Sequence, residues 1–230
     1  MSRLEPAAGC ELLDDPGAAA AQVCESLRNI GRANRWLGGA AAVRFGLERA
    51  FAAATPGARF TMVDVGTGLG DLPRMAQTWG AARGITLVPL GLERHTAAAC
   101  LAGMFGLPVV VGDGGALPFA SGSIDVVLLS QVAHHFAPSG IVQLFRECSR
   151  VARYAVIVAD LRRSRLAAVG FRVAGRVLGF DPDTVRDGVT SLRRGFSAAS
   201  LSELLGRAGI RAPVARRPGA RLVAVWQPPA

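Results

Sequence analysis

Short apolar segments alternate with longer segments of mixed polarity along most of this chain. The short segments predict strands that are buried on both faces, and they lie at 60–65, 85–92, 108–111, 124–129 and 155–159. The segments between them predict helices at 71–79, 96–104 and 139–151. Strands that alternate with helices indicate parallel βαβ units, with helices on both faces of one sheet.

The N-terminal part of the chain departs from this alternation. Residues 16–53 carry two helical patterns, which are broken near Gly38-Gly39. Thr55-Pro56-Gly57 then separates these helices from the first predicted strand. We therefore expect residues 1–57 to form a helical cap and residues 58–230 to form the main domain.

A second departure follows the fifth strand, where residues 161–199 form a predicted insertion. Its first part predicts a cationic helix on which Arg165, Arg172 and Arg176 share one face. Asp181-Pro182 is expected to end this helix, and a polar loop is expected after it.

Regular structure is predicted to resume near the C-terminus. Ser200-Leu-Ser-Glu203 is a capping-box pattern, and it predicts a helix over 200–208 with Gly209 as its stop. Residues 211–216 and 221–226 then predict a closing hairpin.

Length and composition indicate a folded domain with no membrane-spanning segment. It has 230 residues, half of them hydrophobic, which is enough to bury a large core in one domain. No apolar run approaches the length of a membrane span. The first residues are acidic and lack the apolar core of a signal peptide, so a cytoplasmic location is expected.

The cysteines give no sign of a metal site or a disulfide framework. Cys10, Cys24, Cys100 and Cys148 are widely scattered, with no Cys-x-x-Cys pair and no Cys/His ligand spacing. Free thiols are expected at these positions, and no metal is expected.

Charge is distributed unevenly along the chain. The net charge is +9, and every basic side chain apart from histidine is arginine. Residues 1–160 hold 13 arginines and 13 acidic residues, whereas residues 161–230 hold 13 arginines and 4 acidic residues. Such an asymmetry fits an anionic partner, either nucleic acid or a membrane surface, or else a solvated arginine-rich surface.

The stretch Val63–Asp71 is the most informative one for function. It joins a predicted strand to a predicted helix through Gly66, Gly68 and Gly70, with Asp64 two positions before the first glycine. Glycines let a backbone approach a nucleotide-like ligand closely. The Gly-x-Gly-x-Gly spacing differs from the Gly-x-Gly-x-x-Gly of dinucleotide sites, so an NAD-dependent oxidoreductase is disfavoured.

Polar residues also stand at the ends of the next three predicted strands. Glu93 ends the second strand, where an acidic side chain can accept hydrogen bonds from ribose hydroxyls. Asp113 and Gly114 follow the third strand, and Ser130 ends the fourth. Because parallel strands end at one edge of a sheet, these groups are expected to lie near the glycine turn.

Taken in order, these motifs resemble those of class I S-adenosylmethionine-dependent methyltransferases of the small-molecule type. The ubiquinone- and menaquinone-biosynthesis enzymes and polyketide-tailoring enzymes are the most similar. The segments that carry the resemblance are 63–71, 92–93, 112–119 and 124–136. It implies an α/β Rossmann-like fold, with a seven-stranded, mostly parallel sheet whose last strand is antiparallel.

The resemblance also implies S-adenosylmethionine as cofactor. Its binding residues would be Asp64, Gly66, Thr67, Gly68, Gly70, Glu93, Arg94, Asp113, Gly114 and Ser130. Glu93 would bind the ribose diol and Asp113 the adenine amino group. Arg94-His95 replaces the small polar residues usual in the family, and Gly114 replaces a frequent alanine.

Histidines supply the candidate catalytic groups. Methyl transfer to a phenol needs a proton acceptor, and a histidine that faces the cleft can serve as one. His134 and His135 are the candidates for this role, with His95 as a weaker one. Both His134 and His135 could instead be structural, and Tyr154 receives no role.

The acceptor is expected to bind in the segments outside the motifs, 1–57 and 161–195. Their apolar residues and arginines suit a small apolar or aromatic molecule, which could be anionic. Methylation of oxygen is the first expectation and of carbon the second.

RNA methylation is an alternative, although Ser130-Gln131-Val132-Ala133 lacks the Asn/Asp-Pro-Pro-aromatic motif of amino-nitrogen enzymes. A non-catalytic cofactor-binding scaffold is another alternative, and a homodimer is possible.

Overall fold

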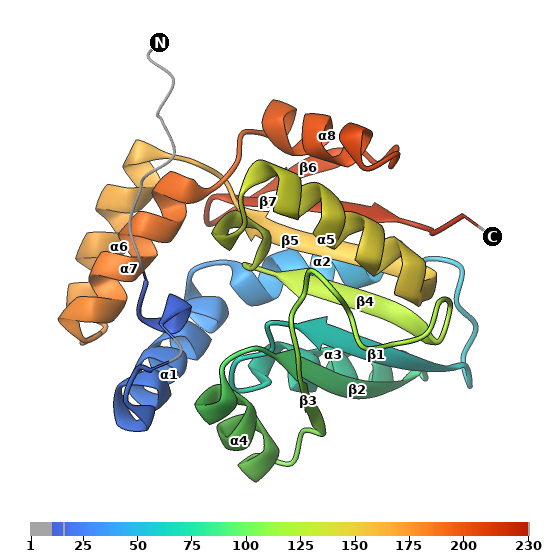
Figure 1. The fold of residues 1–230 in the computed structure, drawn as a ribbon, viewed down its shortest axis with the longest axis horizontal. Coiled ribbons are helices and arrows are strands. Elements are labelled where there is room, and N and C mark those ends of the chain that lie inside the picture. Colours follow the sequence, from blue (N-terminus) through green and yellow to red (C-terminus); the bar gives the residue numbers. More distant parts are fainter. Residues whose placement is uncertain (1–10, 16, 230) are drawn as a thin grey trace.

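One sheet of seven strands organises the protein, in the order β3-β2-β1-β4-β5-β7-β6 (Figure 1). The structure is a computed structural model, and it describes residues 11–15 and 17–229. The pairs β1–β2, β1–β4, β2–β3 and β4–β5 are parallel, whereas β7 is antiparallel to both β5 and β6. This arrangement confirms the predicted Rossmann-like sheet with an antiparallel last strand.

The strands lie close to where the apolar segments predict them. Their bounds are β1 Arg59–Val65, β2 Thr86–Glu93, β3 Val109–Val111, β4 Ile124–Ser130, β5 Ala152–Leu161, β6 Val214–Arg217 and β7 Arg221–Trp226. The largest differences are in β5, which begins three residues before its predicted start, and in β6, which begins three residues after it.

Eight α-helices and two short 3-10 helices complete the described part of the chain. Their bounds are η1 Leu12–Asp14, α1 Ala20–Trp36, α2 Gly39–Ala50, α3 Asp71–Ala81, α4 Thr96–Met104, η2 Ala133–His135, α5 Pro138–Val151, α6 Arg165–Val177, α7 Pro182–Arg194 and α8 Ala198–Arg207. The predicted break between the first two α-helices is confirmed. Gly38 lies there with φ of 91°, and a Cβ at this position would meet the carbonyl oxygen of Pro218 at 2.8 Å.

The predicted loop after Asp181-Pro182 is wrong, because these residues begin a helix. Asp181 is the N-cap of α7, and its carboxylate accepts a hydrogen bond from the backbone N–H of Thr184 at 2.8 Å. Pro182 occupies the first helical position, where no backbone N–H is needed. The preceding helix ends earlier, at Val177, so the dipeptide starts α7 and does not end α6.

The predicted cap of the last helix is also misplaced. Ser197 is the N-cap of α8, and Ser200, predicted as the cap, stands at the third helical position. The Ser197 hydroxyl accepts from the N–H of Ser200, and the Ser200 hydroxyl accepts from the N–H of Ser197. Two reciprocal serine bonds thus replace the expected serine–glutamate pair.

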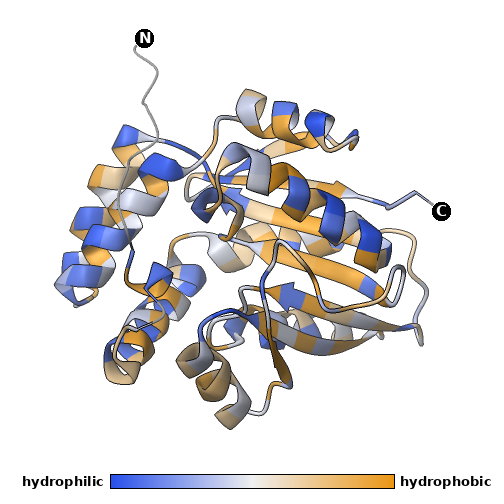
Figure 2. Cartoon of the chain, in the orientation of Figure 1, coloured by the Kyte–Doolittle hydropathy of each residue, from blue (hydrophilic) through white to orange (hydrophobic). Residues whose placement is uncertain are grey.

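The central strands of the sheet are buried on both faces, and Figure 2 shows their mostly apolar colour. Along β4, Val126 and Leu128 join the core beneath α2 and α3, and Val127 and Leu129 join the core beneath α5 and α8. All four side chains are fully buried. Successive side chains of a strand point to opposite faces, so one apolar strand serves both cores.

Three other helices lie beyond the carboxyl ends of the parallel strands. Figure 1 shows α1, α6 and α7 gathered there, to the left of the sheet. The helix α2 instead packs on β5 and β7. The division at residue 57 into a cap and a main domain stays a prediction.

Two further expectations concern the whole chain. Among the described residues, no helix is long and apolar enough to cross a membrane. Cys24, Cys100 and Cys148 carry free thiols, as predicted, and Cys10 lies outside the described residues.

The close packing of α2 on the sheet gives a stability prediction. A Cβ at Gly46 would meet Cγ2 of the fully buried Ile157 at 2.4 Å. We expect Gly46→Ala to lower the free energy of unfolding by about 1–2 kcal/mol, because overpacking outweighs the gain in helix propensity. Urea denaturation measures this. Gly206→Ala in α8 is the matched control, because a Cβ there meets no atom within 4 Å, and it should stabilise slightly. Equal effects of both substitutions would contradict the packing argument.

Candidate functional site

The turn after β1 depends on three glycines in the left-handed region. Gly66, Gly68 and Gly70 have φ of 72°, 54° and 71°. A Cβ at Gly66 would meet Cγ2 of Val132 at 2.4 Å, so the turn has no room for a side chain there. The N–H of Gly66 donates to the carbonyl of Leu92 at 2.7 Å, which ties the turn to the end of β2. The sequence motif is thus explained by both backbone conformation and close approach.

Asp64 lies beneath this turn and is almost completely buried. Its carboxyl group accepts a hydrogen bond from the Thr67 hydroxyl at 3.0 Å. Burial raises the pKa of Asp64 well above its usual value, and the negative charges of Asp71 and Glu93 raise it further. A cationic ligand group beside these three carboxyl groups would relieve that cost.

Glu93 ends β2 and reaches back to the turn. One of its oxygens accepts from the N–H of Gly68 and the other from the N–H of His95, each at 3.0 Å. Arg94 beside it is exposed. His95, the weaker candidate base, is buried and does not line the cavity that the other groups share, so the structure gives it no access to an acceptor.

The ends of β3 and β4 add two further polar groups. Asp113 accepts from the N–H of Gly115 at 2.7 Å, which closes a short turn after β3. A Cβ at Gly114 would meet Leu144 and Val65 side-chain atoms at 3.2 Å each, so this position is closely packed. The hydroxyl of Ser130 is buried and has no hydrogen-bond partner among the described residues.

A single cavity of about 690 Å³ joins these groups. Its volume is in the range of small-molecule sites. Of the ten predicted cofactor residues, nine line it: Asp64, Gly66, Thr67, Gly68, Glu93, Arg94, Asp113, Gly114 and Ser130. Gly70 does not line it and instead caps α3. Both catalytic candidates, His134 and His135, also face the cavity.

His134 forms a buried pair that the sequence did not reveal. Its Nδ1 lies 2.7 Å from Oδ1 of Asp160, and the two side chains are 2% and 0% exposed. Burial alone would raise the pKa of Asp160, but the charge and hydrogen bond of His134 and the N–H of Leu161 together lower it. Asp160 is therefore ionised and acts as an acceptor, so His134 carries its proton on Nδ1.

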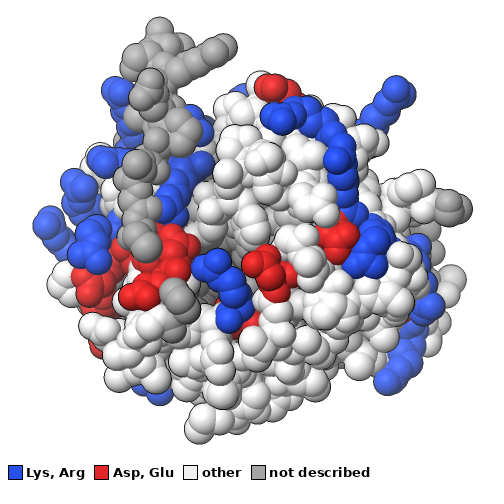
Figure 3. Space-filling model, in the orientation of Figure 1, with Lys and Arg blue, Asp and Glu red and all other residues white. Residues whose placement is uncertain are grey.

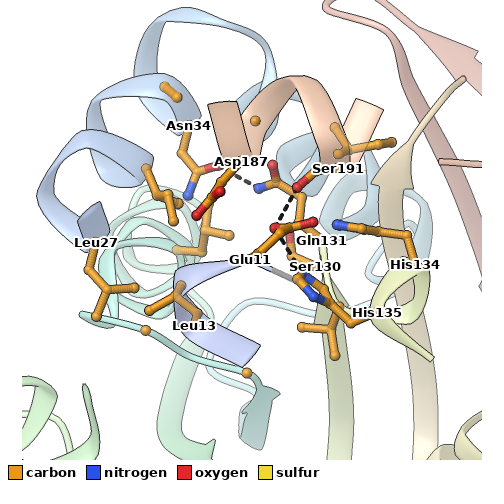
Figure 4. A pocket seen from close by; sticks show the side chains of 18 of the residues that line it. Glu11, Leu13, Leu27, Asn34, Ser130, Gln131, His134, His135, Asp187 and Ser191 are labelled. Atoms are coloured by element: carbon orange, nitrogen blue, oxygen red, sulfur yellow. Dashed lines mark hydrogen bonds and ion pairs between the residues drawn. The ribbon is translucent and has the colours of Figure 1, made fainter. Parts of the chain in front are cut away.

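The other ring nitrogen of His134 is available for chemistry. Nε2 is buried and has no partner among the described residues. In the neutral tautomer that carries its proton on Nδ1, Nε2 would hold a lone pair, and the His134 side chain is part of the cavity lining. Figure 4 shows the ring on the opposite side of the cavity from Asn34 and Leu27.

His135 lies in a different electrostatic environment. Its Nδ1 lies 2.9 Å from Oδ1 of Asp14, and its Nε2 lies 3.8 Å from Oε2 of Glu11. Burial would lower the pKa of His135, but the hydrogen bond to Asp14 and the nearby carboxylates raise it overall. The protonated form is thus favoured, which makes His135 an ion-pair partner rather than a base.

The same carboxylates connect the N-terminal segment to α7. Arg194 donates to Glu11 at 3.0 Å and to Asp14 at 3.1 Å, and the Ser191 hydroxyl donates to Glu11 at 2.7 Å. Figure 4 shows Glu11 between Ser191 and His135. This network holds η1 against the cavity.

Glu11, His134 and His135 also offer ligand atoms of the types that bind divalent metals, within 4.8 Å of one another. Each of the three is already held by another protein group: Glu11 by Arg194, His134 by Asp160 and His135 by Asp14. The arrangement is accounted for as an ion-pair network across the cavity.

A second network crosses the cavity floor. Arg221 donates to Gln131 at 2.8 Å, Gln131 donates to Asn34 at 2.6 Å, and Asn34 donates to Asp71 at 3.0 Å. Gln131 has a positive φ of 59°, which is uncommon for a residue other than glycine. Sequence reasoning missed this network because its members come from four distant segments. Two members had a positional signal: Asp71 at the end of the glycine turn, and Gln131 directly after the fourth strand.

Comparison with known proteins agrees with this geometry. Residues 63–158 match the methyltransferase domain family. No curated protein matches the chain in sequence. Among solved structures, an S-adenosylmethionine-dependent methyltransferase from Aquifex aeolicus is similar with a TM-score of 0.56 at 17% identity, over 90% of this chain and 97% of that one.

Two other similar structures contain S-adenosylhomocysteine. PigF has a TM-score of 0.64 at 19% identity, over 96% of this chain and 63% of that one. Magnesium protoporphyrin IX methyltransferase from Synechocystis PCC 6803 has a TM-score of 0.51 at 13% identity, over 80% and 83%. With the sheet order and the matched family, residues 63–158 form a class I S-adenosylmethionine-dependent methyltransferase domain, and S-adenosylmethionine is the cofactor.

The His135 ion pair gives a pH prediction. A histidine whose folded pKa is raised contributes stability that is fully present below the unfolded value near 6.5 and is lost as pH rises through the folded value. We expect His135→Gln to lower the melting temperature more at about pH 5.5 than at about pH 9. Thermal denaturation at both pH values measures this.

Asp14→Asn is the matched background for this measurement. Because Asp14 makes the shortest contact with His135, the pH dependence of the His135→Gln effect should shrink in that background. An equal loss at both pH values in the wild-type background would mean that the ion pair does not form.

Proposed function

We propose that this class I S-adenosylmethionine-dependent methyltransferase methylates an oxygen of a small aromatic or quinone-like metabolite, in natural-product or quinone biosynthesis. The observation that carries this proposal is the His134–Asp160 pair: the His134 side chain lines the cavity, and its buried Nε2 has no hydrogen-bond partner among the described residues. Methylation of a ring carbon in the same class of acceptor is the second candidate reaction.

The cofactor would occupy the acidic end of the cavity. S-adenosylmethionine carries a sulfonium and an ammonium group, which the carboxyl groups of Asp64 and Glu93 complement. Asp113 would accept from the adenine amino group. The unpartnered Ser130 hydroxyl is an open polar group for the methionine end. When bound, the cofactor supplies a methyl group already activated for displacement.

The acceptor would occupy the other end, where apolar side chains lie beside carboxylates. The apolar side chains come from η1, α1, α6 and α7, among them Leu13, Leu27, Ile30, Phe171 and Leu192, and the carboxylates are Glu11, Asp14 and Asp187. The apolar side chains suit the faces of an aromatic molecule and help to exclude water from the reacting atoms. This chamber is built mostly outside residues 63–158, the part that matches the family.

His134 would then act on the acceptor hydroxyl. A phenol has a pKa near 10, by analogy with tyrosine, so most of it is neutral at neutral pH. Nε2 would take the hydroxyl proton as the oxygen attacks the methyl carbon. Asp160 would hold the ring and stabilise the positive charge that His134 gains. His135 has no such free nitrogen, because its Nδ1 lies 2.9 Å from Asp14 and its Nε2 lies 3.8 Å from Glu11.

Arg221 supports an acceptor that carries negative charge or a carbonyl oxygen. It is 4% exposed, and burial lowers its pKa to about 10 although Asp160 opposes this shift. Its Nε is buried and has no partner among the described residues, while one terminal nitrogen donates to Gln131. A buried guanidinium at the cavity wall is suited to an oxyanion or a quinone oxygen.

Other features bear on the alternatives. One structural relative, the magnesium protoporphyrin IX methyltransferase, is named for a small molecule, which favours this class of acceptor over RNA. The Ser130-Gln131-Val132-Ala133 segment also lacks the motif of base amino methylation. The His134–Asp160 pair argues against a non-catalytic scaffold, for which a free base has no use. The cytoplasmic location predicted from the sequence is part of the same proposal.

The acceptor class is tested with methyl-labelled S-adenosylmethionine. The enzyme is incubated with a panel of phenols and hydroxyquinones, and separately with fractionated host extract and with total RNA. We expect the label in an organic-extractable product whose mass spectrum places the methyl group on oxygen. Label in RNA alone would contradict this proposal and indicate an RNA methyltransferase. Tight S-adenosylhomocysteine binding without label transfer to any fraction would favour the scaffold.

Substitution of His134 tests the base directly. We expect His134→Gln to lower kcat by roughly 10²–10⁴-fold while the affinity for S-adenosylhomocysteine stays near that of the wild type. The deficit should shrink as pH approaches the pKa of the acceptor, because the ionised acceptor needs no base. His135→Gln is the matched control and should keep most of kcat.

Addition of a chelator should leave the wild-type rate unchanged. A strong loss with chelator would instead assign a metal to the Glu11–His134–His135 cluster.

A further inference from the structure

The helix α6 carries an apolar stripe that faces solvent. Leu166, Val169, Val173 and Val177 are 82%, 58%, 56% and 81% exposed. At roughly 100° per residue, their spacing of three, four and four places them in one sector of the helix. Large apolar side chains exposed in a row commonly mark an interaction surface.

The opposite side of α6 is closely packed, so the stripe is not an unfinished core face. A Cβ at Gly188 of α7 would meet the Phe171 ring at 2.2 Å, and one at Gly175 would meet Val185 at 2.8 Å. Ala168 is buried between the two helices in the core cluster they share. These contacts fix the rotation of α6 and leave the stripe pointing outward.

Basic residues border the stripe on one edge. Arg172 and Arg176 are exposed there, and α6 contains no acidic residue. Arg165, Arg172 and Arg193 line a shallow hollow between α6 and α7, and Val169 of the stripe lines it too. Figure 2 shows α6 with alternating apolar and polar colour, and Figure 3 shows blue side chains gathered on this side of the molecule. Exposed apolar side chains thus form one row along α6, and exposed arginines form a second row beside it.

We propose that α6 docks the protein on a lipid bilayer that contains anionic phospholipid. The stripe would enter the boundary between headgroups and acyl chains, and the arginines would contact lipid phosphates from the hollow and its edge. Nucleic acid would complement the arginines but not the leucine and valines. A second copy of the same helix would complement the stripe but would bring only further arginines.

Docking in this orientation would connect the membrane to the cavity. Ala167, Gly170 and Phe171 of the same helix line the cavity, so one helix separates the stripe from the acceptor chamber. An apolar acceptor could then pass from the bilayer to the chamber along α6. This consequence rests on the proposed function, whereas the docking itself does not.

Vesicle binding tests the docking without any acceptor. Full-length protein is floated with vesicles of phosphatidylcholine alone, and with vesicles that also contain phosphatidylglycerol. We expect binding to the anionic vesicles, weakened about tenfold or more by the double substitution Leu166→Glu and Val177→Glu. The pair Arg172→Gln and Arg176→Gln should weaken it roughly fivefold for each arginine, with less effect at high salt.

Matched controls lie elsewhere on the surface. Met104→Glu removes an equally exposed apolar side chain from α4, and Arg211→Gln removes an exposed arginine. Both should bind vesicles as the wild type does. Each variant should keep the wild-type melting temperature shift with S-adenosylhomocysteine, which shows that it is folded.

Several results would overturn the docking proposal. These are no vesicle binding by the wild type, equal binding by the Leu166→Glu and Val177→Glu variant, retention on RNA without binding to vesicles, or a dimer in sedimentation that the same variant dissociates. Failure of the methylation assay would leave the vesicle result standing, because that assay depends on the acceptor. The two proposals therefore fail separately.

Discussion

Burial of the sheet on both faces is the constraint from which the site follows. Every side chain of β4 is buried, and alternate residues serve two different cores. Such strands have little room for charge along their length, so polar residues collect where the parallel strands end. Asp64, Glu93, Ser130 and Asp160 all stand at or near these ends. Figure 1 shows α1, α6 and α7 beyond these carboxyl ends, and residues of all three helices line the cavity there.

The two adjacent histidines show how position alone separates chemical roles. His134 faces Asp160, a buried carboxylate at the end of β5, and keeps one nitrogen free. His135 faces Asp14 and Glu11 from the N-terminal segment, and these carboxylates favour its charged form. A histidine with one nitrogen unpartnered can exchange a proton with a ligand, whereas one with carboxylates near both nitrogens is suited to holding an ion pair. One residue of separation along a 3-10 turn is enough to give each ring its own set of neighbours.

The features of the site that could be predicted from the sequence are those whose signal lies within a few neighbouring residues. The glycine turn, Glu93 and Asp113 carry their signal within a few residues of a strand end, and the strand pattern places them together. Asp160 also ends a predicted strand, yet its pairing with His134 depends on the register of β4 against β5. Arg221 and Asn34 reach the cavity only through the last strand and the first helix, which no motif links. The start of α7 was missed for a different reason: Asp181-Pro182 suits the end of one helix and the beginning of the next equally well.

The division between matched and unmatched segments has a physical meaning. Residues 63–158 build the end of the cavity that we propose for the cofactor, where the chemistry of one ligand would restrict the residues that fit. The end that we propose for the acceptor is lined by η1, α1, α6 and α7, which in this proposal would have to suit both a particular acceptor and its source. In α6 these two demands meet on one helix. Phe171 faces the chamber, Leu166 and Val177 face outward, and close glycine contacts with α7 keep the two faces from exchanging. A helix fixed in this way can change its outer face without altering the chamber, so acceptor choice and surface attachment can vary independently on one methyl-transfer scaffold.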